Sequence, residues 1–334
     1  MLRRREWLIL ALGLAVEFIA FFWLRSVTHA HGGEMVFLTG DSGAYKLYAE
    51  NLLQYHVFSF SKDAPFYPDS LRTPGYTIFA ALLFSVTRSW DVAILLQGIL
   101  VRVAPLLVYL ICRCLDERVE FIAAFVFLFD PNRIVWSNTL MTDAPMTVLL
   151  LLSLWTFIRW TEARSWRFLA GSGVLLGLAT MFRPVTMFLW IAFIIIIVVH
   201  DRLRNWKTWI PHAAIFLVSF TLLIMPWSIR NKLTFGSWQL SAVGGYSFAY
   251  AHAILYAHEK TREPLESLYR RFNALIGADK DPIRSVSLEK MDLYGRFARE
   301  LINGDYLGYA KWHLVKSIPF FLTDGLRAPA QLFG

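Results

Sequence analysis

Long apolar runs constrain the fold of this chain more than any other feature of its sequence. A helix needs about 20 apolar residues to cross the hydrocarbon core of a bilayer. Seven runs approach this length, at residues 7–24, 92–112, 119–137, 144–160, 167–182, 184–200 and 209–227. Because lipid offers no hydrogen-bond partners, membrane-spanning segments with such runs are expected to be helical. The sequence therefore predicts an all-α polytopic membrane protein.

Composition agrees with this prediction. Hydrophobic residues make up 56% of the 334 residues and charged residues only 17%, which is far from the balance of a soluble protein. The net charge of +8 does not indicate nucleic-acid binding, because the basic residues stand beside the apolar runs instead of on one face. The only cysteines, Cys112 and Cys114, are too close for an ordinary disulfide and are expected to be free thiols.

The basic residues also predict the topology. Lysine and arginine concentrate in alternate connections, and the positive-inside rule makes these connections cytoplasmic. They are Arg3, Arg4 and Arg5; Arg113 and Arg118; Arg159, Arg164 and Arg167; Arg202, Arg204 and Lys207. The first run is too long for a signal-peptide core, so we expect a retained span with a cytoplasmic amino terminus. The short apolar run at residues 76–86 is then predicted to be a helix at the membrane interface.

This topology divides the chain into two regions. Residues 1–227 form the predicted membrane region, in which residues 25–91 are a long first extracytoplasmic loop. Residues 228–334 form a predicted extracytoplasmic segment that ends in a short apolar stretch.

The first loop contains an amphipathic helix that starts near Asp41. Tyr45, Tyr48, Ala49 and Leu52 follow the i, i+3, i+4, i+7 spacing of one apolar face. At the start of this helix, the Asp41 carboxylate can cap backbone N–H groups and face the positive end of the helix dipole. Capping alone would explain an aspartate at this position.

Two charged residues fall inside predicted spans. Glu17 and Arg102 stand near the middle of the first and second spans, where an unpaired charge is costly. Their similar depth predicts that they form an ion pair.

Other polar residues gather at the predicted outer face. Asp143 lies between the third and fourth spans, Arg183 between the fifth and sixth, and Arg230 after the seventh. Taken one at a time, Asp143 could be a helix cap and the arginines could reach headgroups. Together with Asp41, they suit a ligand that carries a phosphate and a reacting hydroxyl, because arginine binds phosphate oxygens and a carboxylate can take a hydroxyl proton.

Motifs of soluble enzymes are missing from the sequence. It contains no GxxxxGK[ST] phosphate loop, no GxSxG turn and no HExxH zinc pair. His29 and His31 are weak candidates for a shared metal, since no cysteine lies near them.

Five short motifs carry a family resemblance. They are Gly40-Asp41-Ser42-Gly43-Ala44-Tyr45 with Ala49; Arg72-Thr73-Pro74-Gly75-Tyr76; Leu140-Met141-Thr142-Asp143; Gly177-Leu178-Ala179-Thr180-Met181-Phe182-Arg183-Pro184; and Pro226-Trp227-Ser228-Ile229-Arg230-Asn231. In the order of these motifs, in their spacing and in the membrane face at which they are predicted to lie, the chain resembles integral-membrane glycosyltransferases of the GT-C superfold. Among these it is most similar to the dolichyl-phosphate-mannose-protein mannosyltransferases and their bacterial RgtA/B/C/D-like relatives.

This resemblance implies a reaction and a set of site residues. A sugar would pass from a polyprenyl-phosphate donor to an extracytoplasmic glycan, lipid or protein, with inversion at the anomeric carbon. The implied roles are Asp41 as catalytic base, Asp143 as second catalytic acidic residue, Arg183 and Arg230 as ligands of the donor phosphate, and Tyr45, Arg72, Tyr76 and Asn231 as substrate-positioning residues. Relatives differ in their use of a divalent metal, so the sequence predicts no firm cofactor and leaves a metal open.

Two further readings stay open. The chain could be a transporter or flippase of lipid-linked sugars, although such proteins carry paired repeats and polar residues at mid-membrane. It could also be a partner subunit with a degenerate site. By resemblance, the expected location is a bacterial inner membrane. Relatives have several more spans after the region that matches the Arg230 motif, so the resemblance leaves open whether Gly334 is the natural end.

Overall fold

The computed structural model describes residues 3–30, 33–34, 40–278 and 282–322, and all regular elements in these ranges are helices. The chain divides into two compact units. The described part of the first unit comprises the residues up to Phe66 and Thr73–Pro226, and that of the second comprises Tyr67–Arg72 and the residues from Trp227 onward. The prediction of an all-α polytopic membrane protein is confirmed.

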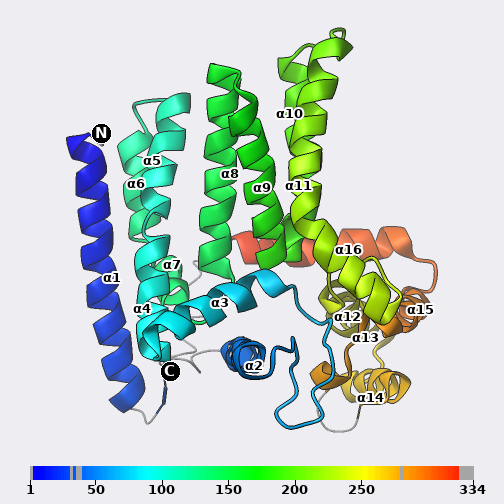
Figure 1. The fold of residues 1–334 in the computed structure, drawn as a ribbon. Helices are drawn as coiled ribbons and strands as arrows, with labels where there is room; N and C mark the ends of the chain where they lie inside the picture. Colours follow the sequence, from blue (N-terminus) through cyan, green and yellow to red (C-terminus); the bar gives the residue numbers. More distant parts are fainter. Residues whose placement is uncertain (1–2, 31–32, 35–39, 279–281, 323–334) are drawn as a thin grey trace. The chain divides into compact units, whose positions relative to one another are not determined.

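The first unit is a bundle of upright helices with two helices lying across one end (Figure 1). The crossing helices are α2 (Gly40–Tyr55) and α3 (Pro74–Thr87). The others are α1 (Arg4–Ala30), α4 (Trp90–Val101), α5 (Ala104–Leu115), α6 (Glu120–Leu128), α7 (Pro131–Ser137), α8 (Asp143–Ala163), α9 (Trp166–Phe182), η2 (Pro184–Phe188), α10 (Leu189–His200) and the first part of α11 (Trp206–Phe235).

Four segments in the described ranges are long and apolar enough to cross a bilayer. They are α1, the combined stretch Trp90–Leu115, α8 and α11. The predicted spans 167–182 and 184–200 correspond to shorter apolar helices, α9 and η2–α10. The predicted division into a membrane region and an extracytoplasmic segment stays a prediction.

The run at residues 119–137 is two helices instead of one. Helix α6 ends at Leu128 and α7 begins at Pro131. Asp130 caps α7 by accepting a 3.0 Å hydrogen bond from the Asn132 amide. Since proline has no amide hydrogen to donate, it fits the first turn of a helix but interrupts a helix that would continue through it. This local chemistry places the start of α7 at Pro131, and Arg133 in its first turn.

The crossing helices are held by a core that joins four elements. Tyr45 and Ala49 of α2 pack with Tyr76 of α3, Phe21 of α1 and Ile94 of α4 in one buried cluster. The predicted apolar face of α2 is confirmed, because Tyr45, Tyr48 and Ala49 are buried and Leu52 packs against the same cluster.

Helices α9 and α11 approach closely along two glycines. A Cβ atom on Gly173 would lie 2.5 Å from the Phe216 carbonyl oxygen, and one on Gly177 would lie 2.8 Å from Leu223 Cβ. Only glycine permits these contacts, so the small residues of Gly173–Gly177 serve helix packing, as small-xxx-small patterns do.

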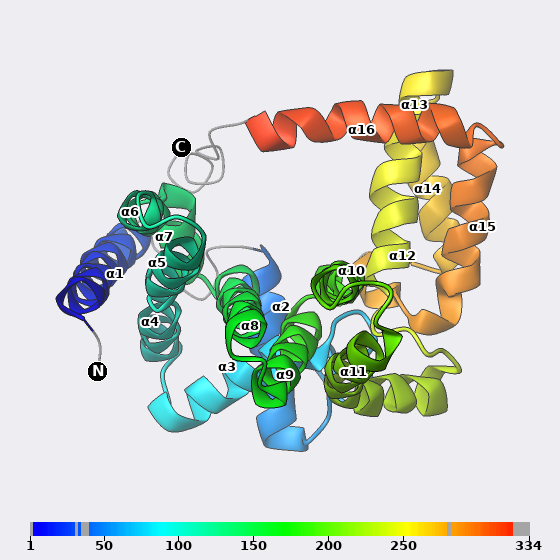
Figure 2. The same ribbon diagram turned by 90° about the horizontal axis from the view of Figure 1, so that it is seen from above.

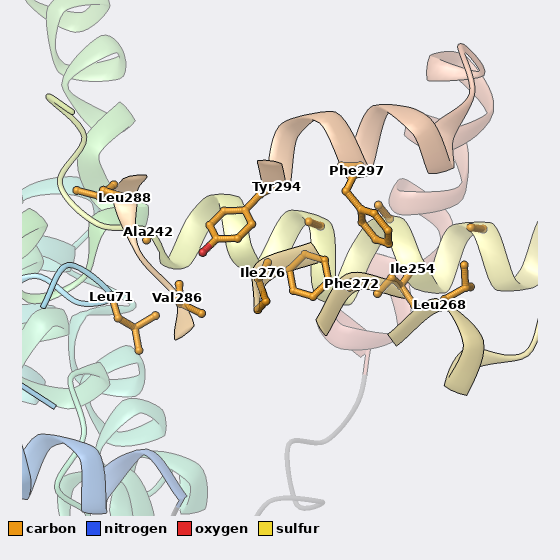
Figure 3. Packing of buried hydrophobic residues seen from close by; sticks show 14 residues of the cluster. Leu71, Ala242, Ile254, Leu268, Phe272, Ile276, Val286, Leu288, Tyr294 and Phe297 are labelled. Atoms are coloured by element: carbon orange, nitrogen blue, oxygen red, sulfur yellow. The ribbon is translucent and has the colours of Figure 1, made fainter. Parts of the chain in front are cut away.

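The second unit contains α12 (Val243–Ser247), the π-helical η3 (Phe248–Ala253) and α13 (Ile254–Thr261), which follow one another directly. Helices α14 (Leu265–Ile276), α15 (Met291–Ile302) and α16 (Tyr306–Leu322) lie around them (Figure 2). Leu268, Phe272, Tyr294 and Phe297 of α14 and α15 pack on Ile254 in the buried core (Figure 3). The linker Tyr67–Arg72 enters this core through Leu71.

Candidate functional site

Asp143 and Arg183 form an ion pair in the first unit. Asp143 is the first residue of α8, and Arg183 follows the last residue of α9. Arg183 Nη1 donates to Asp143 Oδ1, and the two side chains are 44% and 40% exposed. The sequence placed both residues at one membrane face, and the ion pair between them is an addition from the structure. An anion and a cation that both remain accessible can also contact a ligand.

Close packing of α3 on the end of α9 fixes the position of Arg183. A Cβ atom on Gly75 would lie 2.6 Å from the Met181 carbonyl carbon, so glycine is required where the two backbones meet. After Arg183 the chain turns into η2 at Pro184, and a 3.0 Å hydrogen bond between the Thr180 and Thr186 hydroxyls closes this turn.

Two tyrosines connect α2 to this pair. The rings of Tyr45 and Tyr76 lie edge to face with centroids 4.7 Å apart, and Tyr76 also contacts Phe182 at 6.0 Å. Burial raises the pKa of Tyr76 well above its ordinary value, and the nearby Tyr45 and Asp143 raise it further. Asp41 is exposed in the first turn of α2, four residues before Tyr45, which places it one turn along the same helix face.

Hydrogen bonds in the core hold the segment that precedes Asp143. The Gln97 amide nitrogen donates to the carbonyl oxygens of Ser137 (3.1 Å) and Thr139 (2.8 Å). Tyr76 donates its hydroxyl to Gln97 Oε1 at 2.7 Å. The Tyr76 hydroxyl is thus used inside the protein, and any effect of Tyr76 on a substrate acts through the position of these elements.

The predicted pair of Glu17 and Arg102 is confirmed. Arg102 Nε lies 2.6 Å and Nη2 lies 2.5 Å from Glu17 Oε2, with both side chains almost fully buried. Arg102 Nη2 also donates to Ser137 Oγ at 2.9 Å. A side chain on Gly98 would overlap the Glu17 carboxylate, so this glycine makes room for the pair. The pair thereby joins α1 to the end of α7.

A cavity of about 260 Å³ opens beside Asp143. Its wall combines polar residues, mainly from α7 and α8, with apolar residues from α4, α5, α6 and α7. The lining residues are Val101, Arg102, Ala104, Pro105, Phe127, Asp130, Asn132, Arg133, Trp136, Ser137, Asp143, Ala144 and Thr147. The sequence patterns gave Arg133 no role in the site. The Asp130-Pro131 helix start could have indicated it, because this start places Arg133 in the turn that faces Asp143.

Three predicted site residues belong to the second unit. Arg230 donates to the Asp69 carbonyl oxygen (2.7 Å) and to Asn231 Oδ1 (2.8 Å). The buried Asn231 donates to the carbonyl oxygens of Gln239 (2.8 Å) and Leu240 (3.2 Å), which holds the loop after α11. Arg72 is half-buried at the end of the linker Tyr67–Arg72.

The residues that the structure describes build no metal site from protein ligands alone. Within the ranges that the structure describes, no three His, Cys, Asp or Glu side chains converge on one point. Asp143 is neutralised by the guanidinium of Arg183, and His31 lies outside the described residues. We therefore derive no step through a metal.

Comparison with known proteins finds a family match for part of the chain. Residues 71–229 match the family model of the dolichyl-phosphate-mannose-protein mannosyltransferases, and the match includes Tyr76, Asp143 and Arg183. Asp41 precedes the matched region and Arg230 directly follows it. No curated protein and no solved structure matches the chain. This match, which covers just under half of the chain, supports a GT-C mannosyltransferase-like membrane glycosyltransferase.

Proposed function

We propose that this protein transfers a sugar from a polyprenyl-phosphate donor to an extracytoplasmic glycan, lipid or protein. The observation that carries the proposal is the accessible Asp143–Arg183 pair, which is held beside Tyr76 within the region of the family match. An arginine that remains exposed at a membrane protein's polar turn can bind a phosphate oxygen.

The proposed reaction is a single displacement. Asp41 accepts the proton of the acceptor hydroxyl while this oxygen attacks the anomeric carbon of the donor. The bond between that carbon and the phosphate oxygen breaks, polyprenyl phosphate leaves with the electron pair, and the configuration inverts. Because α2 exposes Asp41 one turn before Tyr45, the base lies on the helix that packs against α3.

Arg183 is proposed to stabilise the negative charge on the leaving phosphate. For Arg230, which belongs to the second unit, the same role rests on the sequence resemblance alone. Asp143 would orient Arg183 and contribute the second carboxylate of the site. Tyr45 and Arg72 are proposed to position substrate. Tyr76 and Asn231 would do so indirectly, because their polar groups are already hydrogen-bonded inside the protein.

The proposed location is a bacterial inner membrane, with the amino terminus in the cytoplasm and the site outside. Four helices suited to crossing a bilayer support the membrane setting. The orientation rests on the arginine and lysine residues that flank the apolar runs.

The experiment compares wild type with Asp41→Asn in lipid bilayers, using a panel of polyprenyl-phosphate sugars and cell-envelope acceptors. Released polyprenyl phosphate is measured, and the matched control is Asp63→Asn, which changes an exposed carboxylate in the same loop. We expect Asp41→Asn to lower turnover about 10²- to 10⁴-fold and Asp63→Asn to leave it unchanged. Equal turnover in wild type and Asp41→Asn would remove Asp41 from the chemistry. Movement of intact donor across the bilayer without release of phosphate would support the flippase alternative.

A further inference from the structure

A buried carboxylate joins two helix connections in the first unit. Asp201 directly follows α10, and its side chain is 0% exposed. Its Oδ1 accepts a 2.5 Å hydrogen bond from Arg164 Nη2, and its Oδ2 lies 2.5 Å from His212 Nδ1. Arg164 follows the last residue of α8, whereas His212 belongs to α11. The carboxylate therefore ties the α8–α9 connection to the α10–α11 pair, at the end of the bundle away from α2 and α3 (Figure 1).

A second histidine lies against both charged groups. His200, the last residue of α10, has its Nδ1 2.7 Å from Arg164 Nη1 and 3.2 Å from Asp201 Oδ1. Because arginine carries hydrogen-bond donors and no acceptor, the shorter contact requires His200 Nδ1 to be the acceptor, so His200 is neutral with its proton on Nε2. His212 has no such restriction, since its Nδ1 faces a carboxylate oxygen and can donate to it in either charge state. The two histidines contact different oxygens of Asp201, so these three side chains do not converge on one metal position.

Protonation of His200 changes which cation Asp201 binds. The His200 side chain is 34% exposed, so it exchanges protons with water. A proton on its Nδ1 makes the contact with Arg164 one between two donors, and it places two positive groups 2.7 Å apart. The same N–H can donate to Asp201 Oδ1, which is the oxygen that holds Arg164. Protonated His200 therefore competes with Arg164 for one carboxylate oxygen and repels it from that oxygen.

The other charged groups near these connections do not replace Asp201 in this exchange. The remaining basic side chains are all exposed and are Arg167, Arg202, Arg204 and Lys207. In the described part of the chain, no hydrogen bond or ion pair joins them to His200. The carboxylate of Glu162 on α8 pairs with Arg159. Although burial raises the pKa of Asp201, hydrogen bonds from His212, Arg164 and His200 lower it overall, so this carboxylate stays charged while a histidine titrates.

We propose that His200 is a proton-binding site that controls a latch between the α8–α9 and α10–α11 connections. With His200 neutral, Arg164 binds both His200 and Asp201, and the latch is closed. With His200 protonated, His200 takes Asp201 Oδ1, Arg164 is released to water, and the two connections separate. Histidine ordinarily changes charge between about pH 5 and pH 8, so the latch responds in this range. The basic residues of both connections predict that they face the cytoplasm, and the latch would then sense cytoplasmic pH.

The latch holds the far end of the helices that carry the candidate site. Asp143 is the first residue of α8 and Arg164 follows its last, so a helix of 21 residues, about 30 Å long, separates them. The exchange among Arg164, His200 and Asp201 involves no sugar and no lipid. It goes beyond the proposed function and is measured without any substrate.

Distances between two spin labels on the full chain in nanodiscs test the latch. Cys112 and Cys114 are first replaced by serine. Nitroxide labels are then attached to Trp166→Cys and Leu203→Cys, because the native side chains at these positions are 59% and 71% exposed. We expect a single distance at about pH 8 and a second, longer distance whose population is several-fold larger at about pH 5. The same distance distribution at both pH values would overturn the proposal.

Three variants assign the titrating group. His200→Asn keeps an acceptor near the Nδ1 position but does not titrate, so we expect the shorter distance at both pH values. Arg164→Gln removes the cation that closes the latch, so we expect the longer distance at both. His212→Asn is the matched control: it removes the other histidine of the same carboxylate, keeps an N–H donor, and should respond to pH as wild type does. A pH response that persists in His200→Asn, or that disappears in His212→Asn, would overturn the proposal.

Nitrogen-15 NMR of the histidine rings provides a measurement on the wild type itself. The signals of His200 are those that His200→Asn lacks. We expect its Nδ1 to be unprotonated and its Nε2 protonated at about pH 8, and both to be protonated at about pH 5. A proton on His200 Nδ1 at the higher pH would overturn the proposal. Opening of the latch in a protein that transfers no sugar would reject only the proposed function, and sugar transfer by a protein whose latch never opens would reject only the latch.

Discussion

Arg102 Nε donates a 2.6 Å hydrogen bond to Glu17 Oε2 inside the first unit, and this bond joins residues 85 positions apart in the sequence. The same guanidinium holds Ser137, which lies six residues before Asp143. The pair therefore stabilises the bundle and also supports the turn that carries the candidate site.

Removing one partner of this pair is expected to lower the free energy of unfolding. Arg102→Leu would leave the Glu17 carboxylate buried without its cation, which destabilises by about 3–5 kcal/mol. In the double variant Glu17→Gln with Arg102→Leu, no buried charge remains, and part of the loss should be recovered. Thermal unfolding in lipid measures both variants. A double variant no more stable than Arg102→Leu alone would contradict this account.

The contact of Gly75 with Met181 predicts a steric effect. Gly75→Ala would place a methyl group 2.6 Å from a carbonyl carbon, and either α3 or the end of α9 must move. We expect a loss of about 1–3 kcal/mol in unfolding free energy together with reduced turnover, because Arg183 follows this contact by two residues.

Gly171→Ala is the matched control for this change. Gly171 lies in α9, and a Cβ there meets no atom within 4 Å. Because alanine favours helix more than glycine does, the control should be neutral or stabilising by about 1 kcal/mol. A Gly75→Ala protein as stable and active as the Gly171→Ala protein would show that the close approach is not required.

The Asp143–Arg183 pair predicts a separation between stability and activity. Both side chains are partly exposed, so Arg183→Gln should change unfolding free energy by at most about 1 kcal/mol. If Arg183 stabilises the leaving phosphate, the same variant should lower kcat by about 10²-fold. Arg25→Gln, which removes another accessible ion pair of the first unit, should leave kcat unchanged. A fall in stability that accounts for the whole loss of activity would assign Arg183 a structural role only.

Asp305 predicts a pH dependence in the second unit. Hydrogen bonds from Lys260, Tyr256 and the Gly308 amide lower the pKa of Asp305 from 3.8 to about 2. Because the pKa of Asp305 is lower in the folded protein than in the unfolded protein, its charged carboxylate stabilises the fold at pH values above the unfolded pKa. This stabilisation is present above about pH 4 and is lost as the pH falls through about 2.

Hydrogen exchange of the α13 and α16 amides between pH 5 and 2 measures this effect, with Asp305→Asn as the reference. After correction for the intrinsic pH dependence of exchange, wild type should lose protection across this window. Asp305→Asn should have lower protection at pH 5 and a smaller change. Parallel profiles for the two proteins would show that the contacts of Asp305 do not stabilise this region.

Parts of the site could be predicted because they depend on local pattern. The spacing of Tyr45, Tyr48 and Ala49 defines one helix face regardless of its partner, and this face is buried as expected. Similar depth in two spans was enough to pair Glu17 with Arg102, because an unpaired buried charge is so unfavourable. Asp143 and Arg183 were placed at the same membrane face, but their ion pair was not predicted.

The sequence by itself determined the helical membrane class, the apolar runs that are helical and the charges that need partners, because these depend on hydropathy and short-range periodicity. Only the tertiary structure decided which polar groups are used internally. It directs the Tyr76 hydroxyl to Gln97 and the Asn231 amide to the loop after α11, while Arg133 remains accessible beside Asp143. These assignments depend on contacts between elements distant in sequence, and hydropathy and periodicity carry no information about which atoms such elements bring within hydrogen-bond distance.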